Sequence, residues 1–353
     1  MNSTGTSTVE GIDEPSTTDW LEANVGLKPP VTFALVPGGR SNLTFRVTDS
    51  GGEDVILRRP PTSHVLPTAH DMQREHRIIS ALGPTPVPVP RALALCLDAG
   101  VTGAPFYVME FVRGHVLRDP VTAAATLDER GRRHASESLA DVLADLHDVD
   151  VDAAGIGDLG RREGYLKRQL HRWHGQFDQS QLEDAERVRL IDDVYERLAG
   201  SVPEQAETTI VHGDYRLDNT MLADDGSVAA VLDWEICTLG DPLADLGVLM
   251  VYWAEPDDEM TPLGSAPTTA GGFASRAEMR ERYGERSGRD VSELEYYVAF
   301  GYWKLACILQ GVRARYHGGA AAGDRTGVDL FGTQVTTLAA SAAEAADAAG
   351  LPS

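Results

Sequence analysis

Three polar residues in the second half of the chain are spaced so that they could hold a divalent cation and accept a proton. Segment 211–219 reads VHGDYRLDN after an expected strand, and segment 231–235 reads VLDWE at the end of the next one. Two strands related as in a hairpin can direct Asp214, Asn219 and Asp233 towards one point. Carboxylate and amide oxygens suit Mg²⁺, which keeps few protein ligands beside water and substrate phosphates. The remaining carboxylate, that of Asp214, could then accept the proton of a hydroxyl group.

These two segments closely resemble the catalytic core of protein kinases, where H-R-D-x-x-x-x-N precedes D-F-G. They resemble more closely still the H-G-D-x-x-x-x-N and D-W-E pattern of the aminoglycoside phosphotransferase and choline kinase family. The resemblance extends over nearly the whole chain, from Trp20 to Arg315. GDYRLDN at 213–219 and the RWH around Trp173 are most similar to the branch related to the kinase-like domains fused to acyl-CoA dehydrogenases.

The resemblance implies a role for each matching residue. Asp214 would be the catalytic base for the acceptor hydroxyl, and Arg216 would offset charge on the transferring phosphoryl group. Asn219 and Asp233 would be the ligands of a Mg²⁺ ion that bridges the phosphates of ATP. An HGD triplet alone is common in turns, but its combination with an asparagine five residues on and a following D-W-E is far more specific.

The elements that must position these residues divide the chain into two parts. The first 112 residues predict a small, mainly antiparallel sheet with an inserted helix, from strands at 32–36, 43–48, 54–59, 92–97 and 105–111 and helices at 17–25 and 70–82. From Gly114 on, helical patterns dominate, at 137–147, 164–177, 182–198 and 242–253. Short strands at 208–211 and 228–232 are expected to form a hairpin-like pair, and the segment 255–272 is expected to be a lid or loop.

The predicted fold class is therefore α+β, a bilobal protein-kinase-like fold with a small antiparallel-sheet N-lobe and a larger, mostly helical C-lobe. Residues 1–16 are expected to form a flexible leader and residues 17–112 the ATP-binding N-lobe. Residues 113–353 form the expected C-lobe, with the catalytic loop, the metal site and the acceptor site.

A glycine-rich hairpin tip supplies the first candidate contact with ATP. Gly38 and Gly39 have no side chains to keep backbone N–H groups from phosphates, and Ser41 and Asn42 follow directly. A hairpin turn needs glycine in any case, so this pattern by itself is equally typical of a structural turn. Its position relative to the other motifs matches the family's loop over the phosphates.

The strand at 54–59 carries a departure from the kinase pattern. V-I-L-R at 55–58 resembles the kinase V-A-I-K, with Arg58 in place of the lysine. No lysine lies between Lys28 and Lys167, so arginine must supply this charge. Arg59 is the alternative, although strand alternation directs it to the opposite face. Glu75, on the following helix, is the expected ion-pair partner.

The last expected strand of the N-lobe leads to the hinge between the lobes. There the backbone at Glu110 and Val112 would meet the edge of the adenine. In the C-lobe, Asp241 is expected to cap a helix, and Asp245 to hydrogen-bond the catalytic loop. Glu235 could reach substrate or metal, or lie in solvent.

Composition restricts the partners. The chain has 54 aspartates and glutamates but only 31 lysines and arginines, which gives a formal charge of −23 over 353 residues. Such a charge repels nucleic acid and anionic membranes, so neither is an expected partner. The scattered Cys96, Cys237 and Cys307 are typical of reduced thiols, and no signal-peptide pattern opens the chain, so a cytoplasmic location is expected.

The predicted function is ATP- and Mg²⁺-dependent transfer of the γ-phosphate to a hydroxyl of a small molecule. The branch resemblance suggests a hydroxyacyl acceptor, either a hydroxyacyl-CoA or a hydroxy acid, and Arg172 and His174 would suit its negative charge. The alternatives are an aminoglycoside-type antibiotic kinase, favoured by the acid cluster Asp257, Asp258 and Glu259, and a catalytically weak nucleotide-binding pseudokinase. A protein kinase fits less well, because no A-P-E segment follows Asp233.

Overall fold

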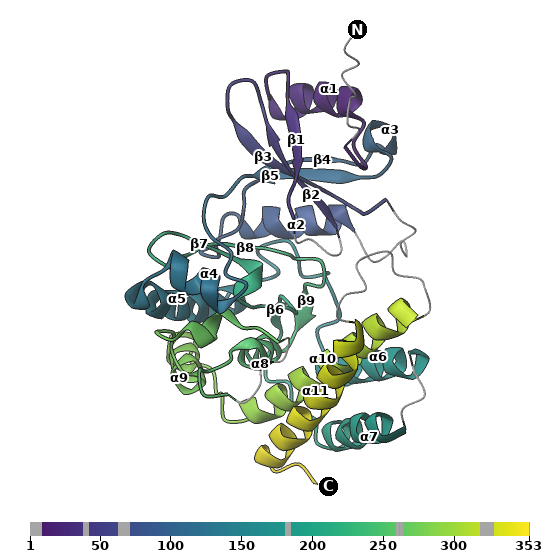
Figure 1. The fold of residues 1–353 in the computed structure, drawn as a ribbon, viewed down its shortest axis with the longest axis vertical. Coiled ribbons are helices and arrows are strands. Elements are labelled where there is room, and N and C mark those ends of the chain that lie inside the picture. The colour runs from purple at the N-terminus through teal and green to yellow at the C-terminus, as the bar shows by residue number, and fades with distance from the viewer. Residues whose placement is uncertain are drawn as a thin grey trace. The chain divides into compact units, whose positions relative to one another are not determined.

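The computed structural model describes residues 9–37, 42–62, 71–180, 185–258, 261, 264–317 and 328–352 (Figure 1). The chain forms two compact units, which are described separately. The N-terminal unit comprises Met1–Gly114 and Ala229–Glu235, and the C-terminal unit comprises His115–Val228 and Ile236–Ser353. The segment with the D-W-E motif thus belongs to the N-terminal unit, although it follows the catalytic-loop motif in the sequence.

The N-terminal unit is built on a five-stranded antiparallel sheet in the order β1-β2-β3-β5-β4. Its elements are α1 (Glu14–Val25), β1 (Thr32–Leu35), β2 (Leu43–Thr48), β3 (Asp54–Arg59), α2 (Met72–Leu82), β4 (Ala92–Cys96), α3 (Ala99–Thr102) and β5 (Phe106–Glu110). In the register, Leu57 of β3 lies opposite Phe45 of β2 and Val108 of β5, and all three are buried. The strands predicted at 43–48, 54–59 and 105–111 are therefore confirmed.

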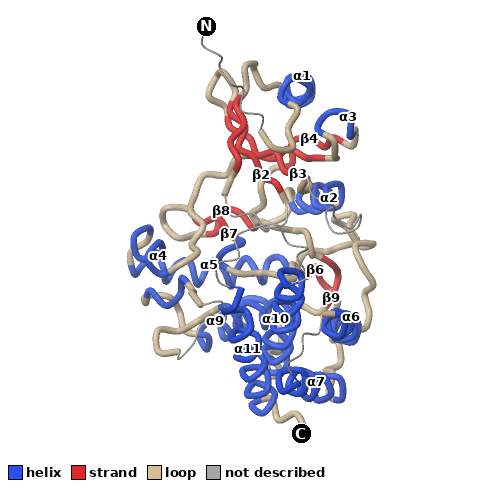
Figure 2. Tube along the Cα trace, turned by 45° about the vertical axis from the view of Figure 1, so that its right-hand side comes forward, coloured by secondary structure: helices blue, strands red, loops and turns tan. Residues whose placement is uncertain are grey.

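The two faces of this sheet carry different side chains. Phe45, Leu57 and Val108 belong to the apolar core that also contains Leu21 of α1. Helix α2 packs against β4 and β5, and α1 and α2 lie on opposite sides of the sheet (Figure 2). Because successive strand residues point to opposite faces, Arg58 is directed to the face of α2.

The C-terminal unit is mostly helical. Its helices are α4 (Pro120–Thr126), α5 (Glu129–His147), α6 (Tyr165–Gln179), α7 (Ala185–Gly200), α8 (Leu243–Tyr252), α9 (Arg276–Ser287), α10 (Leu294–His317) and α11 (Val328–Ala348), with the 3₁₀ turns η1 (Leu217–Asn219) and η2 (Pro267–Ala270). Helix α10 packs against α6, α7, α8 and α11. It approaches α8 closely at Gly247, where a Cβ atom would lie 2.6 Å from the carbonyl oxygen of Tyr297. None of the described helices combines the length and apolar character needed to cross a membrane.

One expected strand pairing needs correction. β6 (Thr209–Val211) pairs with β9 (Thr238–Gly240), which the sequence did not predict, and not with β8 (Val228–Val231). A turn at Ala223–Ser227 brings the chain from β7 (Thr220–Leu222) to the start of β8. Strands of three residues are too short for alternation to show which of them pair.

Candidate active site

The loop after β6 presents Asp214 from a tightly fixed backbone. Val211 and His212 are fully buried, and Gly213 has φ 87°, a left-handed conformation that favours glycine. A Cβ atom at Gly213 would also lie 3.0 Å from the side chain of Ile236. The chain then turns outwards at Asp214, whose side chain is 31% exposed and so can meet a ligand.

Asp245 holds this loop from the first turn of α8. Its two carboxylate oxygens accept hydrogen bonds from the backbone N–H groups of His212, at 2.6 Å, and Gly213, at 2.7 Å. Burial acts to raise the pKa of Asp245. The pKa is nevertheless lowered, because Asp245 is stabilised as a carboxylate by the hydrogen bond and charge of His147, by the charge of His212 and by the N–H of Gly213. The loop-binding role predicted for Asp245 is confirmed. Asp241 is structural as well, since it accepts hydrogen bonds from the N–H of Leu243 and the hydroxyl of Tyr297.

Arg216 and Asn219 both contact the Asp214 carboxylate. The side-chain amide nitrogen of Asn219 donates to Oδ2 of Asp214 at 2.8 Å and to its backbone carbonyl at 2.8 Å. Because both bonds use the nitrogen, the amide oxygen of Asn219 is the atom suited to bind a cation. Arg216 Nε lies 3.3 Å from Asp214 Oδ2, an ion-pair distance without hydrogen-bond alignment, and its guanidinium lies 4.5 Å from the ring centre of Tyr252.

In the N-terminal unit, Arg58 lies at the centre of a partly buried cluster of charges. Its Nε is 3.0 Å from Oε2 of Glu75, and its Nη2 is 2.6 Å from Oδ1 of Asp233 and 3.9 Å from Oε2 of Glu235. Glu75 is 2% exposed and also accepts hydrogen bonds from Asn42, at 3.3 Å, and from the Tyr107 hydroxyl, at 3.0 Å. The expected Arg58–Glu75 ion pair is present, and it extends to the D-W-E motif.

The charges in this cluster depend on each other. Burial acts to lower the pKa of Arg58, but the charge of Glu75 and those of Asp233 and Glu235 raise it above its usual value. Burial also raises the pKa of Glu75, while Arg58 acts in the opposite direction. Arg58 therefore stays charged and compensates a carboxylate that would be costly to bury alone.

Arg59 points away from this cluster, as strand alternation predicted. It is buried and donates hydrogen bonds to the backbone carbonyls of Gly11, Pro60 and Thr102. It therefore has a structural role, and Arg58 is the arginine that faces the charged residues of the unit.

Asp233 is the only residue other than glycine, within the described part of the chain, that has a positive φ. Its φ of 65° places it in the left-handed region, where most side chains are strained. Such strain persists only where surrounding contacts hold it, and it is frequent at ligand sites. The ion pair with Arg58 is one such contact, and Asn42 binds the neighbouring Glu235 at 3.3 Å.

The structure describes some, but not all, of the other residues expected to contact the nucleotide. Gly39 and Ser41 lie outside the described residues. Glu110 ends β5 with an exposed side chain and a backbone N–H that donates to the Arg91 carbonyl at 2.9 Å, and Val112 follows beyond the strand. The backbone at Glu110 and Val112 stays the predicted contact with the adenine edge.

Sequence reasoning missed two groups beneath the catalytic loop. His147, on α5, lies with Nε2 3.5 Å from Asp245 Oδ2 and with Nδ1 2.7 Å from the Tyr283 hydroxyl. Lys304, on α10, donates from Nζ to the carbonyl of Gly213 at 2.9 Å. A lysine within the otherwise apolar run 298–309 of this helix was the available signal, but only the fold shows which backbone atom it meets.

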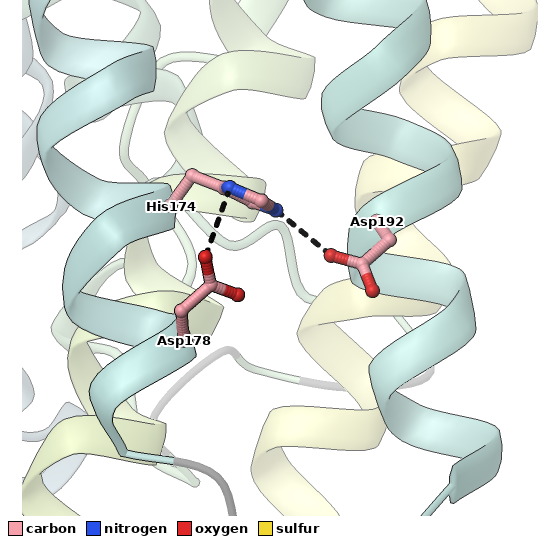
Figure 3. Close-up of side chains that lie close together, drawn as sticks. All are labelled: His174, Asp178 and Asp192. Carbon is pink, nitrogen blue, oxygen red and sulfur yellow. Dashed lines mark hydrogen bonds and ion pairs between the residues drawn. The ribbon is translucent and has the colours of Figure 1, made fainter.

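His174, one of the residues expected to contact the acceptor, contacts two carboxylates of the protein instead. His174 of α6 lies between two carboxylates, with Nε2 2.8 Å from Asp192 of α7 and Nδ1 3.6 Å from Asp178 (Figure 3). Its ring also stacks on Tyr195 at 3.9 Å. The imidazole of His174 and the carboxylates of Asp178 and Asp192 are close enough to one another to hold a divalent cation. Both imidazole nitrogens already face a carboxylate, however, so the cluster acts as a polar link between α6 and α7.

Comparison with known proteins shows the family of this chain. The model of the phosphotransferase enzyme family matches residues 32–296. The chain is 33% identical to mouse acyl-CoA dehydrogenase family member 10 and 34% identical to the probable acyl-CoA dehydrogenase IBR3 of Arabidopsis thaliana, in each case over 81% of this chain. These matches span only 27% and 37% of the two relatives.

Solved structures show the same fold. A Ralstonia eutropha protein of the aminoglycoside phosphotransferase type is 32% identical, with a TM-score of 0.78, over 95% of this chain and 98% of its own. The GDP complex of aminoglycoside 2'-phosphotransferase-IIIa is 13% identical, with a TM-score of 0.62, over 93% and 99% of the two chains. This chain therefore has the protein-kinase-like fold and belongs to the phosphotransferase enzyme family.

Proposed function

We propose that this protein transfers the γ-phosphoryl group of ATP to a hydroxyl of a small, negatively charged acceptor of the hydroxyacyl class. Family membership supports the phosphotransferase activity, and the contacts of Asp214 support its role as the base. Asp214 would accept the hydroxyl proton while Arg216, 3.3 Å from its carboxylate, offsets charge on the transferring group. Phosphoryl transfer otherwise depends mainly on position and electrostatics, because it needs little covalent chemistry from the protein.

Asn219 and Asp233 are the proposed ligands of Mg²⁺. Their donor atoms are an amide oxygen and a carboxylate, the hard oxygen ligands that this ion prefers. When bound, Mg²⁺ would neutralise charge on the ATP phosphates. Arg58 is the proposed phosphate-binding cation of the N-terminal unit, and Glu75 holds it in place.

One observation supports a negatively charged acceptor: an exposed arginine on α6 lies beside a tryptophan whose ring also approaches the buried Lys304, a contact of the catalytic loop. Lys304 contacts the Gly213 carbonyl, and its Nζ lies 5.8 Å from the ring centre of Trp173. The guanidinium of the exposed Arg172 lies 4.9 Å from the same ring. Arg172 and the ring of Trp173 thus offer a cationic and aromatic patch on α6, in a protein whose net charge is −23.

The acid cluster that favours an aminoglycoside is weaker than its sequence suggests. Asp258 forms an ion pair with Arg276 and accepts a hydrogen bond from the backbone N–H of Glu255 at 2.9 Å. Glu259 lies outside the described residues. A polycationic acceptor would therefore have to compete with Arg276 for Asp258.

The acceptor can be identified by measuring ADP release from Mg·ATP with three panels: 3-hydroxyacyl-CoA thioesters, free hydroxy acids, and aminoglycosides such as kanamycin. We expect turnover with the first or second panel and none with Asp214→Asn. Arg172→Glu should raise KM for the anionic acceptor at least about fivefold, since reversing an exposed charge costs on the order of 1 kcal/mol, and leave KM for ATP unchanged. Preferred phosphorylation of kanamycin, improved by Arg172→Glu, would overturn the proposed acceptor class.

A further inference from the structure

Helix α10 carries one buried cation in the part that packs beneath the catalytic loop. Lys304 is 6% exposed, and its neighbours Trp303, Ala306 and Cys307 are buried apolar residues. An ammonium group buried without a partner costs several kcal/mol, so the group that Lys304 contacts is informative about its role.

The partner of Lys304 is a backbone carbonyl, not a carboxylate. Its Nζ donates to the carbonyl oxygen of Gly213 at 2.9 Å, across 91 residues of sequence. No ion pair of Lys304 is present within the described residues. Burial lowers the pKa of Lys304, the charges of Asp214 and Asp245 act in the opposite direction, and Arg172 lowers it further. The ammonium group thus lies in the field of Asp214 while its hydrogen bond goes to the loop backbone.

That carbonyl belongs to the peptide group directly before Asp214. On the other edge of the same peptide, the N–H of Asp214 donates to Nδ1 of His212 at 3.3 Å. The preceding N–H groups, of His212 and Gly213, are held by Asp245. Asp245 therefore fixes the start of the loop, and Lys304 and His212 fix the plane of the peptide from which the Asp214 side chain extends.

We propose that Lys304 is a positioning residue for phosphoryl transfer: it fixes the Gly213–Asp214 peptide plane and so directs the Asp214 carboxylate at the acceptor hydroxyl. The proposal rests on Asp214 being the base, as proposed above, and is independent of which acceptor is used. A carboxylate displaced by about 1 Å can lower a rate about 100-fold, so a single hydrogen bond at this peptide can affect kcat strongly.

The test compares Lys304→Met with Tyr296→Phe. Tyr296 is a matched control, because it lies on the same helix, is buried, and donates one side-chain hydrogen bond to a backbone carbonyl, that of Leu198 at 2.9 Å. Two readouts are used: ADP release from Mg·ATP, with the best acceptor of the three panels or with water, and hydrogen exchange of the backbone amides of residues 212–219.

Lys304→Met should lower kcat about 10- to 100-fold, keep KM for ATP within about twofold, and speed amide exchange at 212–219. Lys304→Arg, which keeps a charged donor, should recover most of the lost kcat. Tyr296→Phe should leave kcat within about twofold of the wild type and leave exchange at 212–219 unchanged. If Lys304→Met does not fold, Lys304→Gln replaces it, because glutamine keeps a polar end but stops one atom short of the carbonyl.

The proposal is wrong if Lys304→Met, or its replacement, retains wild-type kcat, or if Tyr296→Phe loses as much kcat as Lys304→Met. A failure of the proposed function gives a different result. The wild type would then produce no ADP with any acceptor or with water. In that case, amide exchange at 212–219 alone tests whether Lys304 positions the loop, and unchanged exchange in Lys304→Met overturns the positioning role.

Discussion

Replacing Arg58 tests whether the arginine that stands for the kinase lysine serves the nucleotide or only the fold. Arg58→Met removes the cation that lies 3.0 Å from Glu75 and 2.6 Å from Asp233. Arg58→Lys keeps one positive charge but lacks the forked guanidinium that meets both carboxylates. The two variants therefore separate the need for charge from the need for the fork.

The size of the effect follows from burial. In Arg58→Met, Glu75 stays 2% exposed and keeps the hydrogen bonds from Asn42 and Tyr107, which bring no charge to compensate it. Breaking a buried ion pair from one side costs about 3–5 kcal/mol, a large share of a typical stability of about 5–15 kcal/mol. Arg58→Lys retains the compensation and loses about one charged hydrogen bond, or about 1.5–3 kcal/mol.

The assay pairs urea unfolding with calorimetric binding of Mg·ATP, which needs no acceptor. Arg59→Lys is the control, because Arg59 is on the same strand and also makes buried hydrogen bonds, but on the opposite face of the sheet. We expect ATP affinity to fall about tenfold or less in Arg58→Lys and about 100-fold in Arg58→Met. It should not change in Arg59→Lys.

A folded Arg58→Met protein that binds Mg·ATP as tightly as the wild type would refute the nucleotide role of Arg58. Equal losses of ATP affinity in Arg58→Lys and Arg59→Lys would refute it as well, because the effect would then come from general loosening of β3. Loss of stability without loss of affinity would leave Arg58 as a purely structural partner of Glu75.

Two further predictions concern carboxylates with several partners. In Asp245→Asn, the side chain offers one oxygen and one NH₂ group to the N–H groups of His212 and Gly213, so one donor faces another donor. We expect urea unfolding to show a loss of about 3 kcal/mol in the free energy of unfolding. A loss of stability below about 1 kcal/mol would contradict the tight loop geometry. The hydrogen bonds of Arg46 and Thr48 lower the pKa of Asp54 to about 2, below its value of about 3.9 in an unfolded chain. Its contribution to stability is therefore complete above about pH 4 and is lost as the pH falls towards 2, so the stability difference between wild type and Asp54→Asn should vanish over that range.

The parts of the fold that could be predicted from the sequence depend on local patterns. Strand β2 alternates apolar and polar residues over its six positions, and Val55 and Leu57 of β3 share one face, which suffices to predict the direction of Arg58. Helix α5 was expected to begin at Glu137, yet it begins at Glu129 after the N-cap Asp128. Its first two turns are largely polar, so the apolar periodicity did not reveal them, and the aspartate cap was the better signal.

The remaining parts depend on residues that meet only through the fold. The family resemblance predicted that Asp245 holds the catalytic loop, but it could not show that Lys304 contacts the next peptide of that loop, because Lys304 lies 91 residues from Gly213. The acidity of the chain is similarly uninformative about local charge. Arg58, Arg216 and Lys304 supply cations where carboxylates gather, and each is at least partly buried, where its charge is screened less by solvent than at the surface. A net charge of −23 therefore does not argue against an anionic nucleotide as a ligand.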